Sequence, residues 1–160
     1  MSLIKNILLL ALTVIVSHSA GIIGSLFTVS AIPSWYAFLE KPFFAPPNWV
    51  FAPAWLLLYT LMGVALFLII RATDSLVSKR KGIFFFAVQL VLNALWSIAF
   101  FGLQSPLYGL IVISVLLLLI GVTTYYFFRV SKVAGWLMVP YIAWVSFATL
   151  LNASIFLINS

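Results

Sequence analysis

Residues 107–128 read LYGLIVISVLLLLIGVTTYYFF and contain no charged side chain. A helix needs roughly 20 consecutive apolar residues to cross the hydrocarbon core of a bilayer, so this stretch is long enough to span it. The same length and character recur in residues 6–29, 48–70, 82–101 and 134–158. None of these segments alternates apolar and polar residues as a membrane-spanning strand does. The chain therefore predicts an all-α integral membrane protein, a single domain over residues 1–160 built as a bundle of five transmembrane helices.

The composition requires lipid around most of the surface. Hydrophobic residues make up 66% of the 160 positions, against roughly 45–50% in a typical soluble domain. A soluble chain of this length could not hide so much apolar surface, because a domain of about 150 residues leaves about 30% of its surface in water. Cysteine is absent, which excludes a disulfide framework, a thiolate haem ligand and a cysteine-based metal site. We expect no metal site.

Basic residues are distributed unevenly between the two ends of the predicted helices. With five spans, one end carries Lys5, Arg71, Lys79, Arg80, Lys81, Arg129 and Lys132, and the other carries Lys41 alone. Lysine and arginine are enriched in cytoplasmic loops, so we expect the amino terminus in the cytoplasm, and the first loop and carboxyl terminus outside. Attraction to anionic lipid headgroups accounts for the net charge of +6 without a nucleic-acid partner.

Residues 1–19 also have the outline of a secretory signal peptide, with a basic start, an apolar run, and small residues at Ser17 and Ser19. The apolar run continues to residue 29 and reaches spanning length, which favours a retained helix. Cleavage stays the alternative, and it would leave the orientation of the other spans unchanged. Ala20 and Gly24 form a small-xxx-small pair at which another helix can approach closely, within the subunit or between subunits.

His18 is the only ionisable residue within a predicted span, because Glu40 and Asp74 both fall in loops. Transporters coupled to protons or ions usually place an ionisable residue at mid-membrane, so coupled transport is disfavoured. With no ionisable partner in any span, His18 is expected to be a hydrogen-bonded packing residue rather than a haem ligand or proton relay.

Polar side chains of the third span share one helix face. Gln89, Asn93 and Trp96 follow one another at steps of four and three. Amides are costly in lipid, so this face should point into the bundle. Gln89 could equally form a hydrogen bond between helices or contact a ligand. Asn93 lies beside an indole on the same face and is better placed to hydrogen-bond a ligand.

Two further spans repeat this pattern of aromatic, polar and small residues. The stripes consist of Tyr141, Trp144, Ala148 and Asn152 in the fifth span, and of Trp55, Tyr59 and Gly63 in the second. Pro140 removes one backbone hydrogen bond and widens the space beside it if the helix kinks there. Three such stripes favour a pocket for a flat apolar molecule.

Three motifs carry a resemblance to a known family. They are WYAFLEKPFFAPPNWVFAPAW at 35–55, QLVLNALWSIAFFG at 89–102 and VPYIAWVSFATLLN at 139–152. The chain resembles bacterial members of the tryptophan-rich sensory protein family, whose animal members are called translocator protein or peripheral benzodiazepine receptor. This resemblance implies a five-helix bundle, usually a homodimer, that binds porphyrins such as protoporphyrin IX and haem. In animals it also implies cholesterol and benzodiazepine-site ligands.

The resemblance also implies which residues form the site. The matching pocket positions are Trp35, Tyr36, Trp55, Tyr59, Asn93, Trp96, Trp144, Ala148 and Asn152. Bacterial relatives are linked to light-dependent porphyrin breakdown, in which the tryptophans matching Trp55 and Trp144 are implicated. No acid–base pair, nucleophile or metal cluster for conventional turnover is visible, so whether the protein is an enzyme stays open.

The chain departs from the family at two places. The animal cholesterol motif needs a tyrosine followed by a basic residue, and the corresponding ATLLNASIFLINS has neither, which puts sterol binding in doubt. A loose match at 122–129 is explained more simply by aromatic residues at the membrane interface. Phe43 and Phe44 stand where many relatives have tryptophan.

The first loop, predicted at residues 30–47, is long for a compact fold, and such loops are usually lids or disordered. Its prolines restrict the backbone, and its aromatic residues allow it to dock on the helix ends. We expect a lid over the pocket, with Asn48 capping the second helix, Trp49 at the interface and Lys41 near the carboxylates of a porphyrin.

The sequence thus predicts a membrane sensor that binds porphyrins or similar lipophilic ligands in a lidded aromatic pocket. One alternative is a transporter of tetrapyrroles or other lipophiles, which would need a cavity opening to both sides; no coupling carboxylate or internal repeat supports it. Another is a ligand-regulated signalling scaffold, in which lid closure would change contacts with a partner protein.

Overall fold

The computed structural model describes residues 2–73 and 75–160. Within these residues the fold is all helical, which confirms the expected class. The five long helices are α1 (Leu3–Ser34), α2 (Phe51–Arg71), α3 (Leu76–Ser97), α4 (Pro106–Val130) and α5 (Lys132–Ile158). Three short elements complete the fold: the 3₁₀ turns η1 (Tyr36–Phe38) and η2 (Asn48–Val50), and the π-helical turn η3 (Ile98–Gly102). All five long helices are long and apolar enough to cross a membrane.

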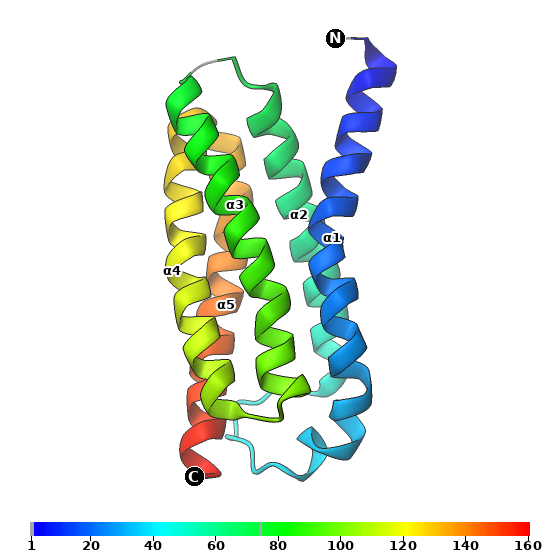
Figure 1. Ribbon diagram of the computed structural model, residues 1–160, viewed down its shortest axis with the longest axis vertical. Coiled ribbons are helices and arrows are strands. Elements are labelled where there is room, and N and C mark those ends of the chain that lie inside the picture. Colours follow the sequence, from blue (N-terminus) through cyan, green and yellow to red (C-terminus); the bar gives the residue numbers. More distant parts are fainter. Residues whose placement is uncertain (1, 74) are drawn as a thin grey trace.

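The helices form one elongated bundle (Figure 1). α4 packs between α3 and α5, α2 packs on α5, and α1 closes the bundle by packing on α2 and α3. The amino and carboxyl termini lie at opposite ends, as an odd number of spans requires (Figure 1). The end with the connection between α1 and α2 is called the loop end below. Which end faces the cytoplasm stays a prediction from the basic residues.

Two helices extend beyond the predicted spans. α1 continues to Ser34, so the first loop is shorter than expected and runs over residues 35–47. Pro33 lies inside the last turn of α1, where it removes only one of the final hydrogen bonds. The expected cap at Asn48 is wrong, because Asn48 lies in η2 and no side chain caps the start of α2.

Serines begin the two helices of the last hairpin. The side chain of Ser105 accepts a hydrogen bond from the Tyr108 amide at the start of α4, and Pro106 occupies the first helical turn. Ser131 ends α4 and caps α5 in the same way through the Ala134 amide. This immediate turn sets α4 and α5 antiparallel along their whole length.

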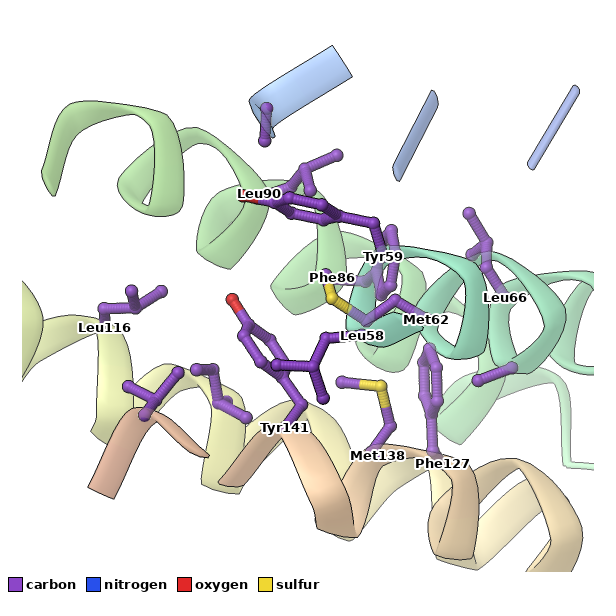
Figure 2. Packing of buried hydrophobic residues seen from close by; sticks show 14 of the residues in the cluster. Leu58, Tyr59, Met62, Leu66, Phe86, Leu90, Leu116, Phe127, Met138 and Tyr141 are labelled. Carbon is purple, nitrogen blue, oxygen red and sulfur yellow. The ribbon is translucent and has the colours of Figure 1, made fainter. Parts of the chain in front are cut away.

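The core lies among α2, α3, α4 and α5, towards the end opposite the loop. Figure 2 shows its large side chains, including Met62, Phe86, Phe127, Met138 and Tyr141, which are all fully or almost fully buried. Long aliphatic side chains such as Leu118 and Leu150 are instead exposed on the outer surface of the bundle. This arrangement suits a lipid environment, in which apolar outer surface carries no solvation cost.

Small residues attach α1 to the rest of the bundle. A Cβ atom at Gly63 of α2 would lie 2.5 Å from the Val14 Cα of α1, so glycine is needed for this approach. A Cβ at Gly21 would lie 2.5 Å from the Tyr59 ring, and one at Gly24 would lie 2.7 Å from Ser97 Oγ. The small residues of α1 therefore pack within the subunit, and Gly63, expected beside the pocket, serves helix packing instead.

Candidate functional site

A cavity of about 450 Å³ lies at the loop end, enclosed by α1, α2, α3 and α5. Its size falls in the range of about 300–1,000 Å³ that is usual for small-molecule sites. The wall is mainly aromatic and aliphatic, and it includes no lysine, arginine, aspartate or glutamate among the described residues. The first loop contributes Tyr36, and η2 contributes Asn48.

The structure brings together most of the predicted site residues. The cavity is lined by Tyr36, Trp55, Tyr59, Asn93, Trp96, Ala148 and Asn152. The remaining candidates, Trp35, Lys41, Tyr141 and Trp144, are not part of its wall. Their roles in binding stay predictions, and their positions are described below.

The end of the cavity farthest from the loop is closed by a chain of hydrogen bonds. The Tyr59 hydroxyl donates to Asn93 Oδ1 at 2.5 Å, and Asn93 Nδ2 donates to the Tyr141 hydroxyl at 2.8 Å. Tyr141 in turn donates to Gln89 Oε1 at 2.9 Å. The chain joins α2, α3 and α5 in a buried region, where unpaired polar groups would be costly. Gln89 thus connects helices, while Gln89 Nε2 has no protein partner among the described residues.

Asn152 fixes the wall nearer the loop. Its Oδ1 accepts from Trp96 Nε1 at 3.1 Å, and its Nδ2 donates to the Pro106 carbonyl at 2.8 Å. These two bonds hold α3, α4 and α5 together and position the Trp96 side chain in the wall. Trp96 also stacks on Phe100, with ring centroids 5.7 Å apart.

The two tryptophans with a predicted photochemical role occupy different environments. Trp55 lines the cavity and stacks on Tyr59 at a centroid distance of 5.3 Å. Trp144 lies behind it, at 6.4 Å and almost perpendicular. It borders a separate groove between α2 and α5, together with Pro46 and Phe147, and its buried indole nitrogen has no protein partner among the described residues.

Tyr141 is likewise one layer behind the cavity. Its ring is fully buried and meets the edge of Trp55 at 6.2 Å. Trp55 and Tyr59 therefore separate Tyr141 from the cavity, and Tyr141 positions the wall through its bond with Asn93.

The π-helical turn η3 supplies wall residues that the sequence analysis missed. Hydrogen bonds from the Leu103 amide to the Ile98 carbonyl and from the Ser105 amide to the Phe100 carbonyl span five residues instead of four. In this wider turn both Phe100 and Phe101 reach the cavity. Single π-turns inside helices are frequent at functional sites, but the local sequence gives no clear signal for one.

The first loop covers the loop end of the cavity. Tyr36 is buried and contacts the rings of Phe100 and Phe101, with centroids 6.2 and 5.8 Å away. Trp35 packs edge-on against Phe100 at 5.4 Å, outside the wall. Burial raises the pKa of the Tyr36 hydroxyl above its ordinary value, so the side chain stays neutral. The loop thus has the position expected of a lid.

Lys41 does not face the cavity. Its ammonium donates to the Leu39 carbonyl at 3.0 Å and lies 4.7 Å from the centroid of the Tyr36 ring. The Tyr36 ring therefore stands between this charge and the cavity. Lys41 could meet a carboxylate only at the outer side of the first loop.

Asn159, at the end of α5, holds the first loop in place. Its Oδ1 accepts from the Glu40 amide at 3.0 Å, and its Nδ2 donates to the Glu40 carbonyl at 2.9 Å. Asn159 Nδ2 also donates a hydrogen bond to the Ile155 carbonyl at 2.8 Å. We call this pair of contacts between Asn159 and Glu40 the latch.

Replacing Asn159 with alanine should release the loop. Loss of two hydrogen bonds, each contributing about 0.5–1.5 kcal/mol, should speed hydrogen exchange of the Glu40 amide roughly tenfold. Exchange mass spectrometry of a peptide covering residues 35–47 measures this change. Ser160→Ala is the matched control, because the Ser160 hydroxyl bonds only to the Phe156 carbonyl of its own helix end. Equal exchange in both variants would show that the latch does not hold the loop.

His18 is hydrogen-bonded, as expected. Its Nε2 lies 3.1 Å from Thr60 Oγ1, and its ring is 5.7 Å from that of Tyr59. It also borders the cavity, which the sequence analysis did not foresee. In the part of the chain that the structure describes, no three His, Cys, Asp or Glu side chains form a metal-ligand set.

Five helices long and apolar enough to span a membrane, four of which border an aromatic cavity, define a polytopic helical membrane protein with a cavity of small-molecule size. The chain belongs to the TspO/MBR family, whose model matches residues 12–158. It is 45% identical over 155 residues to the tryptophan-rich protein TspO of Archaeoglobus fulgidus, covering 97% of this chain and 99% of that protein. It is 43% identical over 155 residues to the protein of the same name from Chlorobaculum tepidum, covering 97% and 98%. Identity to the human translocator protein is 34% over 131 residues, covering 81% and 78%. The resemblance seen in the sequence is confirmed.

Proposed function

We propose that the protein binds porphyrins, such as protoporphyrin IX or haem, and similar lipophilic molecules in this cavity. The observation that carries the proposal is a wall of aromatic faces without a charged group, closed by a loop at one end. A porphyrin macrocycle is broad, flat and apolar, so it can stack on indole and phenyl rings. Membership of the TspO/MBR family supports the same conclusion.

The wall residues suit the ring of a porphyrin better than a coordinated metal ion. Trp55 and Trp96 offer flat faces, and the Tyr59 hydroxyl, whose proton is donated to Asn93, can accept a hydrogen bond from a guest. His18 is the only imidazole in the chain, and its Nε2 is bonded to Thr60. Iron ligation through Nε2 would have to break that hydrogen bond, whereas a metal-free porphyrin leaves it in place.

The carboxylates of a porphyrin should lie at the loop end. Asn48 borders the cavity there, and Lys41 lies just beyond the Tyr36 ring. In this orientation the charged groups stay near water, while the apolar ring occupies the aromatic part of the cavity.

The test is a titration of the purified protein with protoporphyrin IX in detergent. Saturable binding to one site, detected as quenching of tryptophan fluorescence and a shift of the porphyrin absorbance band, is the expected result. The titration is repeated at several detergent concentrations. Quenching that follows the detergent concentration would indicate partition into micelles and would refute the proposed function.

We further propose that bound porphyrin is degraded in light and oxygen, the porphyrin itself acting as the light absorber. Of Trp55 and Trp144, only Trp55 lines the cavity, so Trp55→Phe should slow the loss of porphyrin absorbance several-fold at saturating porphyrin. Trp144→Phe should have the smaller effect, since Trp144 stands behind Trp55. Illumination under argon is the control. Equal bleaching in wild type and both variants would leave binding intact and remove the degradative role.

A further inference from the structure

We infer that lipophilic ligands enter the cavity sideways, from the bilayer leaflet at the loop end, through an opening between α1 and α2. Several residues that line the cavity are also exposed on the outside of the bundle. On α1, Ile22 and Val29 are 64% and 70% exposed, and on α2, Leu56 is 60% exposed. Ser25 and Ala52 likewise line the cavity and are exposed. We take these residues of α1 and α2 as the rim of the opening.

The opening has a defined inner end. α1 and α2 are in close contact where Gly63 meets Val14, and one turn further towards the loop where His18 bonds Thr60. The last of these contacts towards the loop joins Gly21 of α1 to the Tyr59 ring of α2, and beyond it Leu56 and Ala52 of α2 line the cavity. The close contacts through Gly63 and Gly21 therefore lie away from the loop, and the exposed lining residues follow on the loop side of them.

The other sides of the cavity are closed by direct contacts. α1 meets α3 and η3 tightly, since a Cβ at Gly24 would lie 2.7 Å from Ser97 and one at Gly102 would lie 2.9 Å from Phe27. The rings of Trp55 and Trp144 fill the space between α2 and α5. At the loop end, the latch holds the lid over the cavity.

The chemistry of the rim indicates whether the ligand arrives from water or from the bilayer. Ile22, Val29 and Leu56 are aliphatic, and the Ser25 hydroxyl donates to the Ile22 carbonyl at 2.7 Å, so its proton is already satisfied. Such a rim offers nothing to a hydrated molecule. It suits an amphiphile already dissolved in the bilayer, with its apolar body among the acyl chains and its polar end at the headgroups. Only the identity of this amphiphile rests on the proposed porphyrin function.

A labelling experiment tests the opening without any natural ligand. The chain has no cysteine, so Ala148→Cys places a single thiol in the cavity wall, where Ala148 is 7% exposed. In proteoliposomes, an alkyl maleimide that partitions into lipid should label this thiol, whereas a sulfonated maleimide should label it far more slowly. Adding Ser25→Phe should slow the lipid-soluble reagent about tenfold by blocking the rim. Ser30→Phe, at an α1 position that is also exposed but lies outside the cavity, should not.

The control for reagent supply is Ala143→Cys, an exposed position on the same helix outside this cavity. Its labelling should be the same with and without Ser25→Phe. Faster labelling of Ala148→Cys by the sulfonated reagent, or equal rates in the Ser25→Phe and Ser30→Phe backgrounds, would overturn the lateral route.

A second experiment compares the two possible entrances with protoporphyrin IX as the probe. The latch joins the Asn159 side chain to the backbone of Glu40, so residues 40 and 159 are neighbours, and a Glu40→Cys/Asn159→Cys variant is oxidised to lock the lid, with loss of free thiol confirming the disulfide. Transfer of the porphyrin from loaded vesicles should proceed at the same rate in the oxidised and reduced forms. Arrest of transfer on oxidation would mean entry under the lid. If wild type binds no porphyrin, the proposed function fails, and the labelling experiment still decides the route.

Discussion

Replacing Gly63 with alanine is expected to lower the free energy of unfolding by about 2 kcal/mol. The added methyl carbon would lie 2.5 Å from the Val14 Cα and 2.9 Å from the Val14 nitrogen, both backbone atoms of α1. A rotamer change cannot relieve contacts with backbone, so α1 must move away from α2. The resulting loss of packing exceeds the gain of up to about 1 kcal/mol that alanine brings to a helix interior.

Gly121→Ala is the matched control for this prediction. Gly121 also lies inside a long helix, α4, and nothing lies within 4 Å of a Cβ built there. This variant should be neutral or slightly more stable, because only the helix propensity changes. Unfolding in mixed micelles with increasing sodium dodecyl sulfate, followed by circular dichroism, compares the two. Equal stabilities would show that the Gly63 contact does not hold α1.

Ala148→Phe should weaken protoporphyrin IX binding by about tenfold to a hundredfold. Ala148 lines the cavity from α5, and a phenyl ring there would occupy part of its volume of about 450 Å³. Overpacking a well-packed site typically costs about 1–3 kcal/mol, and each 1.4 kcal/mol is a factor of ten in affinity. The same titration in detergent measures the effect, with circular dichroism as the check on folding.

Ala143→Phe makes the same chemical change on the same helix. Ala143 is exposed and borders the groove between α2 and α5 rather than the cavity. Its affinity for the porphyrin should stay at the wild-type level. If Ala148→Phe binds as tightly as Ala143→Phe, the porphyrin occupies some place other than this cavity.

Hydrophobic length and helical periodicity sufficed for the five helices and for part of the site. Asn93 and Trp96, at a step of three, face the cavity as expected, and so do Ala148 and Asn152, at a step of four. These pairs could be predicted because each needs only a helix and an inward face. The inward face could be identified because it carries the side-chain amides, which are costly to expose to lipid.

Periodicity could not decide which inward residues reach the cavity itself. Tyr141 and Trp144 share the stripe of Ala148, yet both lie behind Trp55, which comes from another helix. Lys41 was placed by charge alone, and its position depends on the Tyr36 ring and the Leu39 carbonyl. The positions of Tyr141 and Trp144 depend on a neighbour distant in the sequence, and that of Lys41 depends on the conformation of the loop. The periodicity of a single helix carries no information about either.

The π-turn lets the two parts of the third helical segment orient their side chains independently of each other. Up to Ser97 its rotation about the axis is fixed by the bonds of Asn93 to neighbouring helices. Beyond Ser97, the directions in which the side chains point are set by the one extra residue in the turn Ile98–Gly102. Returning that turn to ordinary spacing would swing Phe100 and Phe101 around the axis and leave the Asn93 bonds in place. The place of the two phenylalanines in the wall therefore depends on this turn, whereas the place of Asn93 does not.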